Sequence, residues 1–152
     1  MLKFFHTPVR WAMLAVLVLP GMAAAATGLD LQEGYWETRV TVGVQGGILP
    51  LPVIKSGKCI SRKDPLPNSV ESSRMHCRVF DKAVKGNDVS WRLECSDDKG
   101  KMEGQAKITY AGNQFSGKMD ALVTQVEGNR RARLEYVMKG DRVRACRPTD
   151  PQ

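Results

Sequence analysis

Four cysteines, Cys59, Cys77, Cys95 and Cys146, are the side chains of this sequence that are most able to do chemistry. Cysteine thiols bind metals, exchange electrons or form disulfides, and their spacing separates these possibilities. Thiol oxidoreductases and many zinc sites have two cysteines separated by two residues, and no such pair occurs here. An even number of widely spaced cysteines is instead typical of a disulfide framework in an exported protein. We therefore expect two disulfides, no metal site and no cofactor.

The segment between Cys77 and Cys95 has the pattern of one complete β-hairpin. Apolar and polar side chains alternate over residues 89–95, and Lys85-Gly86-Asn87-Asp88 contains residues that tolerate the positive φ angles of a tight turn. A two-residue loop in this turn would place Cys77 opposite Ser96 and not opposite Cys95. One residue of adjustment in the register would bring the two sulfurs together.

Four cysteines allow three connectivities, of which we favour Cys77–Cys95 across the hairpin and Cys59–Cys146 between an early segment and the C-terminus. By loop-closure entropy these two bonds would stabilise the fold by about 3 and about 4.5 kcal/mol, respectively. The second bond would contribute more because it closes the longer loop.

Acid–base catalysis has few candidate residues. The sequence has two histidines, and His76 is the only one outside the N-terminal leader described below. A Ser-His-Asp or Cys-His arrangement would have to use this histidine, which is adjacent to a cysteine that we expect in a disulfide. Asp97 and Asp98 could act as paired carboxylates, although their position also fits a solvated hairpin turn. We predict no catalytic site, and therefore a protein that is not an enzyme.

Residues 1–26 have the organisation of a cleaved signal peptide. Lys3 and Arg10 give a basic start, residues 11–19 form a short apolar core, and small residues precede a cleavage site after Ala26. The alternative is an uncleaved membrane anchor, but the apolar run is shorter than the ~20 residues that span a bilayer. We predict export to the periplasm or beyond, with cleavage near Ala26.

The rest of the chain, residues 27–152, is long enough for a single domain and too short for two. The whole sequence has a net charge of +7. A moderate excess of basic residues favours solubility first and attraction to anionic partners second. Export of the protein argues against nucleic acid as a partner.

Alternating apolar and polar residues predict strand after strand, with no amphipathic helix. Pro50 and Pro52 lack backbone donors, so the second strand should lie at a sheet edge or cross the sheet irregularly. Residues 61–76 contain two more prolines and no period, which predicts the longest loop. Lys139-Gly140-Asp141 should end the strand before the last one. The predicted strands cover residues 34–44, 48–60, the two arms of 77–95, 102–110, 115–124, 132–138 and 142–146.

Seven or eight sequential strands, each with one apolar face, must bury those faces by curling or by stacking. The regular spacing of the turns favours an all-β, antiparallel up-and-down meander that curls into a lipocalin-like or open barrel. A β-sandwich is the alternative. A membrane-spanning barrel is not expected, because the opposite strand faces carry charges of both signs.

Several short motifs occur in a characteristic order. They are Gly34-Tyr35-Trp36-Glu37, Lys58-Cys59-Ile60-Ser61, an isolated Cys77, Val89-x-Trp91 followed by Cys95, Gly112-x-x-Phe115-x-Gly117 and a C-terminal Cys146. Over about residues 29–147, this order resembles the proteobacterial family of domains of unknown function numbered 3617. The resemblance implies a small exported protein with four cysteines, and it implies no activity or catalytic residue. Where relatives have a Met- and Pro-rich stretch, this chain has Ile48-Leu49-Pro50-Leu51-Pro52, which argues against copper binding by methionine there.

Two functions remain open. The first is binding of a small apolar or amphiphilic ligand in a cavity inside the barrel, where aromatic and small side chains alternate. A fully packed core has the same composition, so a filled interior is the alternative. The candidate lining residues are Trp36, Trp91, Ala106, Tyr110, Phe115 and Tyr136.

The second function is contact with an anionic surface or protein through the basic C-terminal hairpin. Glu127, Glu135 and Asp141 occur among its arginines and could pair with them across strands, so a solvated strand face is the alternative. The sequence identifies neither a ligand nor a partner. The candidate residues of this surface are Arg130, Arg131, Arg133, Arg142 and Arg144.

Overall fold

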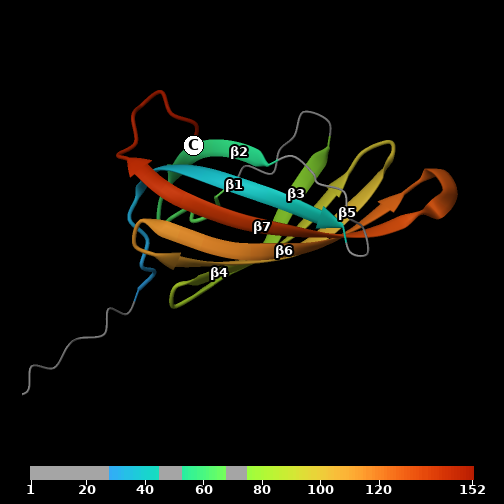
Figure 1. The fold of residues 1–152 in the computed structure, drawn as a ribbon, viewed down its shortest axis with the longest axis horizontal. Helices are drawn as coiled ribbons and strands as arrows, with labels where there is room; N and C mark the ends of the chain where they lie inside the picture. The colour runs from blue at the N-terminus through green and yellow to red at the C-terminus, as the bar shows by residue number, and fades with distance from the viewer. Residues whose placement is uncertain (1–27, 45–52, 68–74) are drawn as a thin grey trace, which may run out of the picture.

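The computed structural model describes residues 28–44, 53–67 and 75–152, so the predicted signal peptide lies outside the described residues. In these ranges, seven antiparallel strands form one sheet, which curls into a half-barrel (Figure 1). The helical structure in the same ranges is a single 3-10 turn, η1 (Glu127–Asn129). The prediction of an all-β, curled antiparallel meander is confirmed. The strands are β1 (Gly34–Val44), β2 (Ile54–Ile60), β3 (His76–Lys85), β4 (Asp88–Ser96), β5 (Gly100–Ala111), β6 (Gln114–Gln125) and β7 (Arg131–Arg144).

The strand order is that of an up-and-down barrel with one open seam. The order across the sheet is β2-β1-β7-β6-β5-β4-β3, so consecutive strands are neighbours except at β2 and β3, and β1 pairs with β7. The seam between β2 and β3 falls at the segment that the sequence predicts to be the longest loop. β2 is an edge strand of the described sheet, as the prolines before it predict, although Pro50 and Pro52 themselves lie outside the described residues.

The β3–β4 hairpin contains the register adjustment that the pairing of its cysteines requires. Near the turn the strands pair as a two-residue loop demands, whereas at the other end Cys77 lies directly opposite Cys95. The register shifts by one residue at a β-bulge that includes Asp81, whose φ of 51° is in the left-handed region. The structure contains the disulfides Cys77–Cys95 and Cys59–Cys146, the two pairs favoured from the sequence.

The prediction that residues 139–141 end a strand is wrong. β7 runs without interruption from Arg131 to Arg144 and includes both the predicted strand and most of its short successor. Gly140 lies in this strand against the ring of Phe115, and a Cβ atom at this position would overlap the ring. The glycine is therefore needed for close packing and not for a turn.

The concave face of the sheet holds the hydrophobic core. At one end of the half-barrel the buried rings of Trp36, Tyr110 and Phe115 lie in mutual contact, with centroids 5.4–5.7 Å apart. Loop residues 61–67 cover this end, where Pro65 is fully buried. The Tyr110 hydroxyl donates a hydrogen bond to the Pro65 carbonyl at 2.7 Å. This end of the interior is packed and is called the packed end below.

Candidate ligand-binding cavity

A cavity lies beside the packed end on the concave face of the described sheet. Its volume is about 290 Å³, close to the lower limit of the 300–1,000 Å³ that is usual for ligand pockets. Most of its wall is apolar, and the concave face thus has both a packed end and a cavity. The large apolar side chains in this wall belong to Val40, Ile54, Trp91, Leu93, Met102, Met119, Tyr136 and Met138.

Strand register explains why these side chains share one face. Directly opposed residues of neighbouring strands point to the same side of a sheet. Tyr136 lies opposite Met119, Met119 opposite Ala106, and Ala106 opposite Trp91. This row crosses four strands on the concave face. Trp91, Met119 and Tyr136 line the cavity, and the small Ala106 is buried between Trp91 and Met119.

Three of the lining residues, Met102, Met119 and Met138, are methionines. A thioether side chain has three rotatable bonds and adapts to irregular shapes, so these residues give the cavity a deformable wall. The Tyr136 hydroxyl donates a weak hydrogen bond to the Met102 sulfur at 3.5 Å. Burial raises the pKa of Tyr136, so its hydroxyl remains a donor at the cavity wall throughout the physiological pH range.

The six residues predicted to line a cavity are divided between the two parts of the interior. Trp91 and Tyr136 line the cavity, whereas Ala106 is buried in the same row of the sheet and does not line it. The other three belong to the packed end, and they are Trp36, Tyr110 and Phe115. Sequence reasoning missed the methionines, although alternation had already placed them on the inner faces of their strands. It also missed Lys58, which lines the cavity from β2.

The C-terminal segment covers part of the open seam. The Pro151 carbonyl accepts a hydrogen bond from the backbone N–H of Cys59 at 2.8 Å, so this segment lies along the edge of β2 (Figure 1). Arg144 donates two hydrogen bonds to the Asp150 carboxylate, at 2.6 and 2.7 Å. These bonds, together with one from the backbone N–H of Arg147, lower the pKa of Asp150 to about 2. Pro151 also lines the cavity, so this ion pair holds one piece of its wall in place.

The arginines considered as one basic surface lie at opposite ends of β7. Arg142 donates a hydrogen bond to the Glu33 carbonyl at 2.8 Å, and Arg144 binds Asp150. About 30 Å of extended strand separates these two from the others. The structure therefore does not bring the five side chains together. Those that are exposed beside η1 are Arg130, Arg131 and Arg133.

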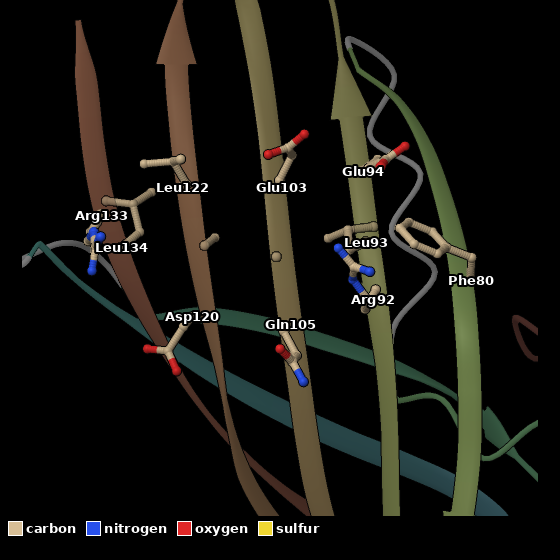
Figure 2. A pocket seen from close by; sticks show the side chains of 12 residues that line it. Phe80, Arg92, Leu93, Glu94, Glu103, Gln105, Asp120, Leu122, Arg133 and Leu134 are labelled. Atoms are coloured by element: carbon tan, nitrogen blue, oxygen red, sulfur yellow. The ribbon is translucent and has the colours of Figure 1, made fainter.

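The convex face has a second hollow, shown in Figure 2. Phe80 stands at its side, with the guanidinium groups of Arg78 and Arg92 at 5.2 and 5.1 Å from the ring centroid. Because charges of both signs alternate across this hollow, it favours no single ligand chemistry. Its charged residues are Arg92, Glu94, Glu103, Asp120 and Arg133.

The candidate acid–base residues occupy ordinary structural positions. His76 is exposed at the start of β3, opposite Ser96. Asp97 accepts hydrogen bonds from the backbone N–H groups of Lys99 and Gly100 at 2.9 and 2.8 Å, as an aspartate in a turn commonly does.

Among the residues that the structure describes, no group of three or more His, Cys, Asp or Glu side chains could hold a metal ion. The same residues include no helix long and apolar enough to cross a membrane.

A family model described as a protein of unknown function, DUF3617, matches residues 31–146. The chain belongs to the DUF3617 family. The match begins at the buried Leu31 and ends at Cys146, so the DUF3617 region includes the seven described strands and all four cysteines. No curated protein and no solved structure matches the chain. Membership of DUF3617 assigns no activity, and the two disulfides indicate an oxidising, exported environment.

Proposed function

We propose that this DUF3617 domain binds a small apolar or amphiphilic molecule in its concave cavity and acts without catalysis. The supporting observation is a cavity of about 290 Å³ with a mostly apolar wall, next to a packed end on the same face of the sheet. Apolar surface that a ligand covers is removed from water, which favours binding. The methionine side chains allow this wall to adapt to the shape of the ligand.

We also infer that residues 1–26 are a signal peptide, removed after Ala26, and that the mature domain resides in the periplasm or outside the cell. The disulfides support this location because such bonds persist in oxidising compartments. Intact-mass spectrometry of the exported protein, without reducing agent, tests the inference. The expected mass is that of residues 27–152 less four hydrogens for two disulfides, whereas a chain that starts at Met1 would contradict it.

Titration with the neutral fluorophore N-phenyl-1-naphthylamine tests binding in the cavity. Ser56 lines the cavity from the exposed edge strand β2, so Ser56→Trp fills this space without entering the packed end. Ser116 is exposed on β6 and lies opposite Thr109 on the convex face, so Ser116→Trp is the matched control.

We expect saturable binding by the wild type, about tenfold weaker binding by Ser56→Trp, and unchanged binding by Ser116→Trp. Absence of binding by the wild type would overturn the proposal. Equal affinity of the wild type and Ser56→Trp would also overturn it, because the ligand would then lie elsewhere.

Contact with an anionic surface is a second candidate function, supported by one observation. Arg130, Arg131 and Arg133 remain exposed together beside η1. Binding of this kind should weaken with salt, because exposed charges are screened. The variant Arg131→Glu/Arg133→Glu should lose binding to anionic vesicles, and salt-independent binding would contradict the mechanism.

A further inference from the structure

We propose that the ligand of this cavity is an anionic single-chain amphiphile, whose carboxylate or phosphate head group binds Lys58 and whose chain lies against the methionines. This inference rests on the proposed function and specifies its ligand. Among the described residues that line the cavity, Lys58 is the one with a charged side chain.

Lys58 points into the half-barrel. It lies directly opposite Trp36 in the β1–β2 register, and Trp36 is fully buried in the core. Because opposed residues share a face of the sheet, Lys58 is on the concave side, and its side chain is only 9% exposed. A lysine is almost never buried to this extent without an anionic partner.

Lys58 shares its anionic partner, Asp64, with a second lysine, Lys82. The Lys58 Nζ atom lies 3.2 Å from Oδ2 of Asp64, and the Lys82 Nζ atom lies 3.8 Å from Oδ1 of the same carboxylate. Two ammonium groups thus share one carboxylate, so the group of three has one uncompensated positive charge. An ammonium group has three hydrogen-bond donors, so an oxygen of a ligand can bind Lys58 while Asp64 stays in place.

The charged and apolar parts of the cavity follow one another along the strands. Lys58 adjoins Trp36 at the packed end. The register places Met138, Met119 and Met102 at successively greater distances from it along the sheet. A head group at Lys58 therefore puts an attached chain over the methionines, where it is removed from water.

The size of the cavity sets the length of the chain. A volume of about 290 Å³ equals that of about ten water molecules in the liquid, at ~30 Å³ each. This volume accommodates most of a chain of medium length. A dodecyl chain is therefore a suitable probe.

An internal role for Lys58 gives a different expectation. If its ion pair with Asp64 serves only to hold loop residues 61–67 against the core, the cavity has no preference between anionic and neutral head groups. Compounds with one chain and different head groups therefore distinguish the two roles.

The experiment is displacement of N-phenyl-1-naphthylamine by dodecanoate, dodecyl phosphate and dodecanol at one fixed pH. Lys58→Met keeps most of the length of the side chain and removes its charge. Lys55→Met is the matched control, because Lys55 is exposed on the same strand and lies opposite Arg39. We expect the wild type and Lys55→Met to bind at least one anionic compound about tenfold more tightly than dodecanol. Lys58→Met should lose this preference and keep its affinity for dodecanol, and the anion that binds more tightly identifies the head group.

Equal affinities of the wild type for the anions and dodecanol, or a preference that Lys58→Met retains, would overturn the inference and leave the proposed function intact. No binding of the fluorophore and of all three compounds would overturn both. If Lys58→Met does not fold, Lys58→Met/Asp64→Asn removes both charges and should lack the preference, whereas Lys58→Arg should retain it.

Discussion

Removal of the Tyr110 hydroxyl tests how the loop over the packed end is held. In Tyr110→Phe the ring keeps its contacts with Trp36 and Phe115, but the carbonyl of the buried Pro65 loses the donor that lies at 2.7 Å. A buried acceptor without a partner costs about 1–3 kcal/mol. We therefore expect the free energy of unfolding to fall by about 2 kcal/mol.

Urea denaturation, followed by tryptophan fluorescence, measures this loss. With an m-value of about 2 kcal/mol/M, the midpoint should fall by about 1 M. Tyr136→Phe is the matched control because its hydroxyl contacts the Met102 sulfur, a weak acceptor, at 3.5 Å. Its cost should stay below about 0.5 kcal/mol. Equal midpoint shifts in the two variants would refute the reasoning that the Tyr110 hydrogen bond secures the loop.

The same hydroxyl should make the stability depend on pH in alkaline solution. Burial, and to a smaller extent the charge of Asp64, raise the pKa of Tyr110 above its usual value of 10.0. The folded state keeps a proton that the unfolded state loses, so this contribution is fully present below pH 10 and is lost as the pH rises further. Above pH 10 the loss should be about 1.4 kcal/mol per pH unit, and Tyr110→Phe should lack this part of the slope. Identical slopes in the two proteins would contradict the assignment.

Three further changes have defined expected outcomes. Cys59→Ala/Cys146→Ala opens a loop with a sequence separation of 87. In urea without reducing agent, it should lower the free energy of unfolding by about 4.5 kcal/mol. A loss below about 1 kcal/mol would argue against stabilisation by loop-closure entropy. Gly140→Ala places a methyl group against the Phe115 ring and should cost about 1–3 kcal/mol. Gly43→Ala, whose added Cβ would make an ordinary contact with the Glu135 carbonyl oxygen at 3.9 Å, should be nearly neutral in the same assay. Because the pKa of Asp150 is lowered to about 2, its contribution is present above about pH 4 and is lost as the pH falls toward 2. In the wild type, protection of the C-terminal segment from hydrogen exchange should therefore decrease at low pH. In Asp150→Asn, this protection should already be low at pH 7. Equal protection of the two proteins at pH 7 would show that Asp150 does not hold the segment in place.

Much of the fold could be predicted from the alternation of side chains, because a curled sheet buries one face of each strand and the side-chain period is two. The first strand has the predicted bounds, 34–44. A register adjustment in the hairpin could be expected, but its position at Asp81 and the role of Gly140 depend on contacts between strands and could not be predicted. The bulge at Asp81 reconciles a two-residue turn with the disulfide at the far end of the hairpin, and Gly140 accommodates an aromatic ring from the neighbouring strand.

The candidate site could be predicted less well for a physical reason. Alternation identifies the inner face of each strand, but it does not show how far along the barrel that face is filled. The filling depends on loop residues 61–67, in which Pro65 is buried over the packed end and Pro67 forms part of the cavity wall. Trp91 therefore lines the cavity, whereas Trp36 does not. The inward direction of Lys58 could not be predicted because the expected strand, 48–60, begins among prolines that interrupt the alternation.

The pairing of β1 with β7 joins the first strand of the described sheet to the last one (Figure 1). Strands β3 to β7 can pair in the order in which they are synthesised, because each one follows its neighbour directly along the chain. Contacts between segments that are distant in sequence form slowly. β1 must wait for β7 before it gains its second neighbour, so we expect the pair β1–β2 to dock last. The strands β1 and β2 are thus synthesised first but dock last. The pairing of the described sheet is complete only after β7 has been synthesised.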